Sequence, residues 1–261
     1  MPHEEIAELV ARAAGHSGNT TPERTTFDTG DHASRHRALI ALVPVLASSA
    51  REAGLRAVAA GRWLVDLVVE ITPRLPIRDA QTLREHHVGL TDIEIAEQLV
   101  KSATWSTAAI GATAGGLAAM EFLAPPTLLA MPAQLAVEML TVTAVELKMV
   151  AELHEILGHP AHGTPAERAS LYLMSWVHRR PISNSAPKAG IGAVLGASAK
   201  RELRTQLMRR LGRSASSLAP FLAGAVAGAE VNRRATRQLG ERLLSELRAQ
   251  ANDRWFHRVK G

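Results

Sequence analysis

The sequence predicts an all-α protein: a multi-helix bundle with an Ala/Gly-rich apolar helical hairpin and basic amphipathic C-terminal helices. Of its 261 residues, 46% are hydrophobic but only 3% are aromatic. The core must therefore be built from Ala, Leu and Val, which favours close-packed helices over sheets. Leu239, Leu243 and Leu247 recur every four residues, the spacing of one helix face. Both observations argue against an all-β fold.

The chain divides into two parts of different composition. Residues 1–34 combine a short amphipathic stretch with a run rich in Gly, Ser, Thr and Pro, which we interpret as a short helix and a flexible tether. Residues 35–261 are interpreted as a single helical domain. The first fifteen residues lack the positive leader and the apolar stretch of a secretory signal, so we expect a cytoplasmic protein.

Two capping boxes mark where helices begin. In Thr91–Glu94 and in Thr164–Glu167, a threonine is followed three residues later by a glutamate, so each side chain can satisfy a backbone N–H of the first turn. An earlier helical pattern covers residues 33–69. Because proline removes a backbone donor and clashes with the preceding turn, we expect a break or kink in that helix near Pro44.

The most apolar region is the predicted hairpin at residues 102–147. Residues 102–120 carry no charge, and three prolines within 125–132 interrupt the region. A membrane span needs roughly twenty predominantly apolar residues, but this stretch is mostly Ala, Gly, Thr and Ser. The hairpin is therefore either the core of a soluble domain or a segment that enters a bilayer. The helix expected over residues 137–157 carries four glutamates and is predicted to be partly exposed.

Pairs of glycines four residues apart occur in three of the predicted helices. Residues at i and i+4 share a helix face, so two glycines there allow another backbone to approach closely. We predict helix packing at these positions and at an asparagine four residues after the last pair: Gly111, Gly115, Gly192, Gly196, Gly224, Gly228 and Asn232.

No arrangement of residues in the sequence indicates catalysis. The chain contains no cysteine, no Gly-x-Ser-x-Gly turn and no phosphate-binding glycine loop. His154 and His159 are five residues apart rather than the four that would aim both imidazoles at one metal ion, and Gly158 interrupts the helix between them. We therefore predict no catalytic residue, no metal site and no cofactor, and expect that the protein is not an enzyme.

The segment from Pro220 to Gly240 has the most specific pattern. Gly224, Gly228, Asn232 and Thr236 follow one another at intervals of four, which gives one helix face that is small at one end and polar toward the other. This spacing resembles the C-terminal signature of the EcsC-like family of bacterial proteins. The block from Ala103 to Gly158, a glycine-rich apolar helix, a proline hinge and a long helix, also resembles that family, and together the similarity covers about residues 90–250. The resemblance implies a helical, membrane-associated accessory protein without known catalytic residues.

Positive charge is concentrated in the last third of the chain. Residues 164–261 contain eighteen basic and six acidic residues, a net charge of +12, whereas residues 102–163 carry one basic and five acidic residues, a net charge of −4. We therefore expect an anionic surface as partner, contacted by basic residues that lie opposite the leucine stripe: Arg233, Arg234, Arg237 and Arg248. The leading hypothesis is peripheral adsorption to anionic lipid, at the inner face of the plasma membrane.

Other partners fit the same charge distribution. A soluble helical interaction module could use these arginines to bind an acidic protein, with no membrane contact. Nucleic acid is disfavoured because stacking aromatic residues are scarce and no helix-turn-helix or zinc-finger pattern is present. The sequence leaves the oligomeric state open.

Overall fold

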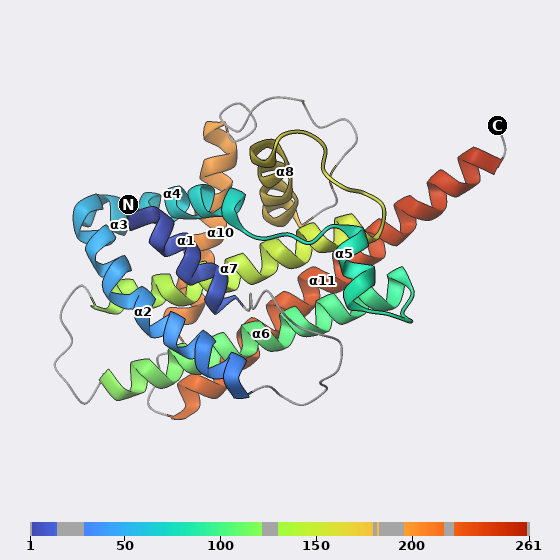
Figure 1. Ribbon diagram of the computed structural model, residues 1–261. Helices are drawn as coiled ribbons and strands as arrows, with labels where there is room; N and C mark the ends of the chain where they lie inside the picture. The colour runs from blue at the N-terminus through green and yellow to red at the C-terminus, as the bar shows by residue number, and fades with distance from the viewer. Residues whose placement is uncertain are drawn as a thin grey trace.

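The computed structural model describes residues 2–14, 29–121, 130–179, 182, 196–216 and 222–259, and all regular structure within these ranges is helical, which confirms the predicted fold class (Figure 1). The helices, in chain order, are α1 (Pro2–Ala13), α2 (Thr29–Ala53), α3 (Leu55–Ala59), α4 (Arg62–Ile71), the short 3-10 helix η1 (Thr72–Arg74), α5 (Ala80–His86), α6 (Asp92–Glu121), α7 (Ala130–Ile156), α8 (Pro165–His178), α10 (Ala197–Ser216) and α11 (Leu222–Val259).

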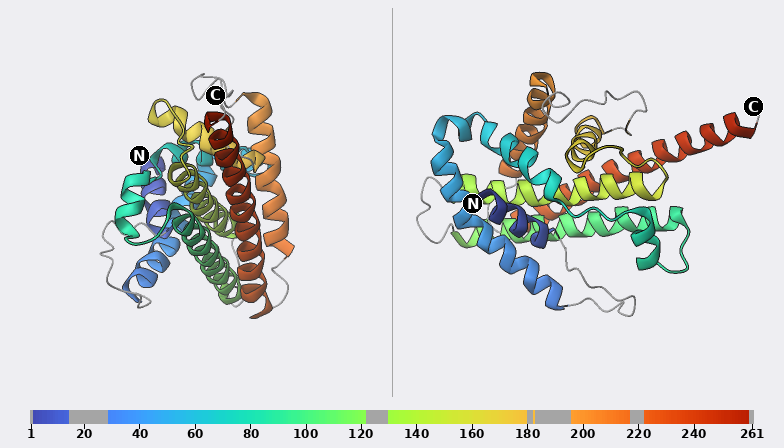
Figure 2. Two further views of the ribbon diagram at one scale, coloured as in Figure 1. Left: turned by 90° about the vertical axis from the view of Figure 1, so that its right-hand side faces the viewer. Right: turned by 45° about the horizontal axis from the view of Figure 1, so that its top comes forward.

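Three long helices, α6, α7 and α11, lie side by side and form the centre of the fold. Helices α1 and α2 pack on one side of this centre, and α10 lies on the other side (Figure 2). Helix α8 lies against α7, and α4 packs between α1, α7 and α10. The C-terminal turns of α11 extend beyond the other helices.

Both capping boxes are present. The backbone N–H of Thr91 donates to Oε2 of Glu94 at 2.8 Å, and the backbone N–H of Glu94 donates to the Thr91 hydroxyl at 3.3 Å. Thr164 and Glu167 make the same reciprocal pair at 2.8 and 3.3 Å. The predicted starts of α6 and α8 are therefore confirmed.

A break or a kink is expected near Pro44, and a break is not found there. Helix α2 continues through Pro44, whose neighbours Leu42 and Leu46 are fully buried and hold the helix against the core. The chain instead interrupts its helices at Gly54 and Gly61, where φ is +82° and +67°. Glycine tolerates this left-handed region because it has no Cβ.

Helix α7 is the buried centre of the molecule. Every side chain from Ala136 to Ile156 is buried, apart from the half-buried Glu138, Lys148 and Glu155. The prediction of a partly exposed amphipathic helix over residues 137–157 is therefore wrong. The acidic side chains of α7 can lie inside the bundle because neighbouring helices supply hydrogen-bond donors, as described below.

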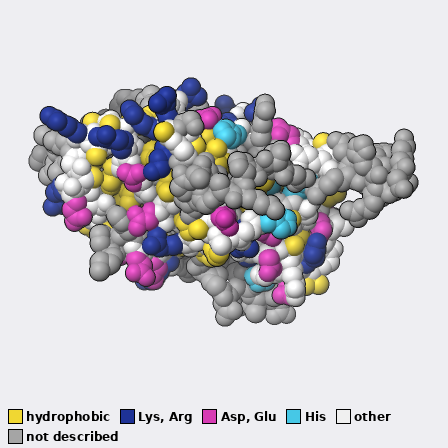
Figure 3. Space-filling model, turned by 90° about the horizontal axis from the view of Figure 1, so that it is seen from above, with side chains coloured by type: hydrophobic (Ala, Val, Ile, Leu, Met, Phe, Trp, Pro, Cys, Tyr) yellow, Lys and Arg dark blue, Asp and Glu magenta, His cyan; other side chains and the backbone are white. Residues whose placement is uncertain are grey.

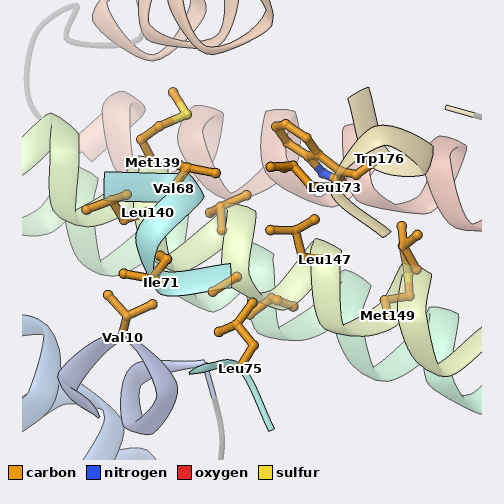
Figure 4. Close-up of a cluster of buried hydrophobic side chains, with 14 of the residues drawn as sticks. Val10, Val68, Ile71, Leu75, Met139, Leu140, Leu147, Met149, Leu173 and Trp176 are labelled. Atoms are coloured by element: carbon orange, nitrogen blue, oxygen red, sulfur yellow. The ribbon is translucent and has the colours of Figure 1, made fainter. Parts of the chain in front are cut away.

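Apolar side chains from several helices meet around α7 (Figure 4). Val10 of α1, Val68 and Ile71 of α4 and Leu140 of α7 are fully buried in this cluster. The N-terminal helix is thus docked in the core, while the tether predicted after it falls mostly at residues 15–28, outside the described ranges. Among the described helices, none is both long and apolar enough to cross a membrane.

Candidate anionic-surface site and polar core

Helices α6 and α11 approach each other most closely at two of the predicted packing glycines. A Cβ added at Gly111 would lie 2.7 Å from the Gly228 carbonyl oxygen and 2.7 Å from Nδ2 of Asn232. A Cβ at Gly228 would lie 3.1 Å from the Gly111 carbonyl oxygen. The two backbones are therefore in contact: a side chain at Gly111 would force them to shift, and one at Gly228 would be tightly placed.

The other predicted packing glycines are placed differently. Gly115 lies one turn after Gly111 on α6, and Gly224 lies one turn before Gly228 on α11. Gly196 precedes α10, and apart from its chain neighbours no atom of the described residues lies within 4 Å of where its Cβ would stand. Gly192 falls outside the described residues.

We call the line of contact between α6 and α11 the seam. Polar side chains continue it from Gly111 and Gly228 into the centre of the bundle. Asn232 Nδ2 donates to Oε1 of Glu138 at 2.8 Å, which joins α11 to α7. One turn later, the Thr236 hydroxyl donates to Oε1 of Glu146 at 2.8 Å and accepts from the Thr107 hydroxyl of α6 at 2.9 Å. The small-to-polar face of α11 is therefore its contact with both neighbouring helices.

Glu146 is the most deeply placed carboxylate of this seam, and it is not among the candidate residues predicted from the sequence. Its side chain is fully buried, and its second oxygen, Oε2, accepts from the Trp176 indole N–H at 2.8 Å. Helices α7, α8 and α11 thus meet at one carboxylate. A glutamate in the middle of an otherwise apolar stretch is the signal that could have drawn attention to it.

His154 is buried, and both of its ring nitrogens are engaged. Nδ1 lies 2.6 Å from the carbonyl oxygen of Val150, and Nε2 accepts the backbone N–H of Ile182 at 3.1 Å. Burial lowers the pKa of His154 to about 4, so the imidazole is neutral near pH 7. His154 therefore connects α7 to the segment after α8, and no trio of His, Asp or Glu side chains within the described residues is arranged to hold a metal ion.

The four arginines predicted to meet an anionic surface each have an acidic partner in the chain. Arg233 and Arg234 both pair with Glu230, and these two guanidinium groups lower the pKa of Glu230 to about 2. Arg237 lies 3.3 Å from Glu241, and Arg248 of α11 lies 2.7 Å from Glu97 of α6. Part of the positive charge on α11 is therefore compensated within the molecule.

A second group of basic side chains lies where α10 crosses the turn between α3 and α4. Gly61 forms this turn, and a Cβ there would stand 2.7 Å from Sδ of Met208 and 3.8 Å from Cγ of Arg204. We call a set of exposed residues from α3, α4 and α10 the α10 face: Arg56, Arg62, Lys200, Arg201, Arg204 and Met208. Within the part of the chain that the structure describes, none of its five cations forms an ion pair.

The surface view agrees with this placement. Lys and Arg side chains gather at the end of the molecule that carries α3, α4 and α10, at the upper left of the view from above (Figure 3). Met208 is 39% exposed among these cations. The i, i+4 spacing of Lys200, Arg204 and Met208 in the sequence is a signal that could have identified this stripe.

Comparison of the chain with protein-family models, with curated proteins and with solved structures gives no match.

Proposed function

We propose that this chain is a non-enzymatic helical accessory protein, of the EcsC-like kind that its sequence resembles, which adsorbs to anionic membrane lipid through its basic C-terminal helices. The observation that supports this proposal is the α10 face, which combines five exposed cations that form no ion pair among the described residues with a half-exposed methionine. The cytoplasmic side of the plasma membrane is the anionic surface that such a protein would meet.

The α10 face suits adsorption better than the arginines of α11. A cation that already has a carboxylate partner must share or lose it before it meets a lipid phosphate, whereas Arg62, Arg201 and Arg204 have no such competitor among the described residues. A basic residue held near an anionic membrane contributes about 1 kcal/mol. Met208 adds an apolar contact, the second kind of interaction that stable peripheral binding uses.

The test is binding of the full chain to vesicles of defined composition. Vesicles that contain phosphatidylglycerol should bind the protein, and vesicles of pure phosphatidylcholine should bind it far less. Binding should weaken as salt rises above 0.1 M, where the screening length is roughly 10 Å. Equal binding to both vesicle types would contradict adsorption by charge.

A pair of matched variants separates the two basic surfaces. The combined variant Arg62→Gln, Arg201→Gln and Arg204→Gln should lower affinity for phosphatidylglycerol vesicles about a hundredfold, since it removes three cations without ion-pair partners among the described residues. The variant Arg233→Gln, Arg234→Gln and Arg237→Gln removes the same charge but should lower affinity less than tenfold, because those arginines have acidic partners. Gln and Arg have similar helix propensity, so both variants should stay folded.

The soluble interaction module is the alternative outcome of this experiment. If the folded wild-type protein binds neither vesicle type at low salt, the membrane proposal is wrong. An acidic protein would then be the partner that the same cations fit.

A further inference from the structure

Helices α8 and α10 meet at an exposed pair of a histidine and a glutamate. Nε2 of His178, the last residue of α8, lies 3.1 Å from Oε2 of Glu202 on α10. The two side chains are 44% and 51% exposed, so both are accessible to water and to protons. The side-chain amide of Gln206, one turn later on α10, donates to the carbonyl oxygen of Val177 and fixes the end of α8 against α10. The packing of two helices therefore brings the pair together.

Glu202 is an acidic residue within a basic helix. Between Ala197 and Ser216, α10 contains one lysine and five arginines but no other acid. Glu202 directly follows Arg201 and precedes Arg204 by two residues, and both arginines belong to the α10 face. The three residues lie within one helical turn, which rises about 5.4 Å, whereas the screening length is roughly 10 Å at 0.1 M salt. The charge of Glu202 therefore weakens the positive potential of the α10 face.

Glu202 is also the carboxylate within ion-pair distance of His178 among the described residues. Helix α8 packs against α7, η1 and α10, and Arg74 of η1 pairs with Glu70. The charged side chains of α7 are bonded to other groups: Glu138 to Asn232, Glu146 to Trp176 and Thr236, Glu155 to Tyr172, and Lys148 and Arg78 to Glu152 in a buried ion cluster. Arg179 and Arg201, which adjoin the pair in the chain, disfavour a further positive charge on His178, and Glu202 favours it.

We propose that His178 makes the α10 face sensitive to pH, because protonated His178 neutralises Glu202 and so strengthens adsorption of the α10 face to anionic lipid. This inference rests on the proposed function. Histidine gains its proton between about pH 8 and pH 5. Without that proton, the pair of His178 and Glu202 has one negative charge beside the cations of the α10 face, and with the proton the pair is neutral. The change should raise the affinity for anionic vesicles about fivefold, as one added basic residue does.

Adsorption and protonation also favour each other. If the proton on His178 raises the affinity for the membrane, the membrane raises the affinity of His178 for the proton by the same factor. The negative surface potential of the cytoplasmic leaflet adds to this effect, because it attracts protons as it attracts other cations. A contact that only joins α8 to α10 would change the stability of the protein with pH but not its affinity for lipid.

The experiment measures the affinity of the full chain for phosphatidylglycerol vesicles at about pH 8 and about pH 5.5, at constant ionic strength. The chain contains 11 histidines, so the increase in affinity at the lower pH is compared between variants that each lack one of them. The wild type should bind more tightly at the lower pH. Wild-type protein that binds at neither pH would overturn both this inference and the membrane proposal.

Two histidine variants assign the pH response. His178→Gln, whose amide can still donate to Glu202, should lose about fivefold of the increase that the wild type shows. His162→Gln, at an exposed histidine of the loop after α7, should keep the whole increase. An equal increase in His178→Gln and in the wild type would overturn this inference and leave the membrane proposal intact.

Glu202→Gln tests the other member of the pair. It removes the negative charge at about pH 8, where His178 does not compensate for it, and should raise the affinity for phosphatidylglycerol vesicles about fivefold above that of the wild type. The matched variant Glu85→Gln removes an exposed acid of α5, which packs against α6 and α7, and should change the affinity less than about twofold. Equal affinities of Glu202→Gln and the wild type at this pH would overturn the inference, because the carboxylate would then not weaken the α10 face.

Discussion

The Thr236 hydroxyl of α11 donates a 2.8 Å hydrogen bond to Oε1 of Glu146, the fully buried carboxylate of α7. The same hydroxyl accepts from Thr107, so one side chain connects all three central helices. Buried carboxylates are tolerated when donors surround them, and Trp176 supplies another donor. The polar seam therefore fixes how α6, α7 and α11 lie against one another.

Thr236→Val should destabilise the protein by about 1–3 kcal/mol, because it keeps the shape of the side chain but removes a donor from a buried carboxylate. Urea unfolding gives the change in free energy. Thr205→Val is the matched control, since Thr205 is exposed on α10 and donates only to the carbonyl of Arg201 in its own helix. Equal effects of the two substitutions would show that the Glu146 contact contributes nothing to stability.

Gly111→Leu should cost about 1–3 kcal/mol or more, because the new side chain begins 2.7 Å from the backbone of Gly228 and forces α6 and α11 apart. Ala109→Leu introduces the same side chain two residues earlier, on the exposed side of α6, and should change stability by less than about 0.5 kcal/mol. Thermal or urea unfolding compares the two. A Gly111→Leu protein as stable as the Ala109→Leu protein would mean that the two helices are not in contact in solution.

The extent to which sequence predicts this structure depends on how local each interaction is. The capping boxes and the leucine stripe involve residues within one or two turns, and the helices follow them. The pairing of Arg233 with Glu230 could also have been predicted from the sequence, because the two residues are three positions apart on one helix. The hydrogen-bond donors around Glu146 could not be predicted from the sequence, since they come from helices thirty and ninety residues away in the chain.

The position at which the helical pattern of residues 33–69 is interrupted shows a second limit of prediction from the sequence. A break or a kink was expected at Pro44, but α2 continues through it, with Leu42 and Leu46 buried on either side of the proline. The turn at Gly61, where φ is positive, lies against Met208 of α10, and no local pattern specifies the position of α10. The α10 face depends on this crossing, and for that reason only its α10 stripe could have been found in the sequence.

Protonation of His154 should destabilise the protein between about pH 6.5 and pH 4. The pKa of His154 is about 4 in the folded state and near 6.5 when unfolded, so the unfolded chain binds the proton more tightly in this window. The stability contributed by neutral His154 is complete above pH 6.5 and is lost as the pH falls, by about 3 kcal/mol in total. Urea unfolding at a series of pH values measures this slope.

His154→Gln removes the titrating group and should flatten the dependence of stability on pH in that window. His162→Gln, a substitution at an exposed histidine of the loop after α7, should retain the slope of the wild type. The same slope in His154→Gln as in the wild type would mean that His154 is not buried as a neutral imidazole.

The ion cluster of Arg78, Lys148 and Glu152 should respond unequally to removal of its members. Glu152→Gln leaves two cations facing each other with little water and should cost about 3–5 kcal/mol, because an uncompensated buried charge is more costly than a missing ion pair. Lys148→Met leaves the neutral, bidentate pair of Arg78 and Glu152 in place and should cost less than about 1 kcal/mol. Urea unfolding of both variants checks the order. If Lys148→Met were the more damaging substitution, the lysine rather than the arginine would be the principal partner of Glu152, and the excess of positive charge in the cluster would reside on Arg78.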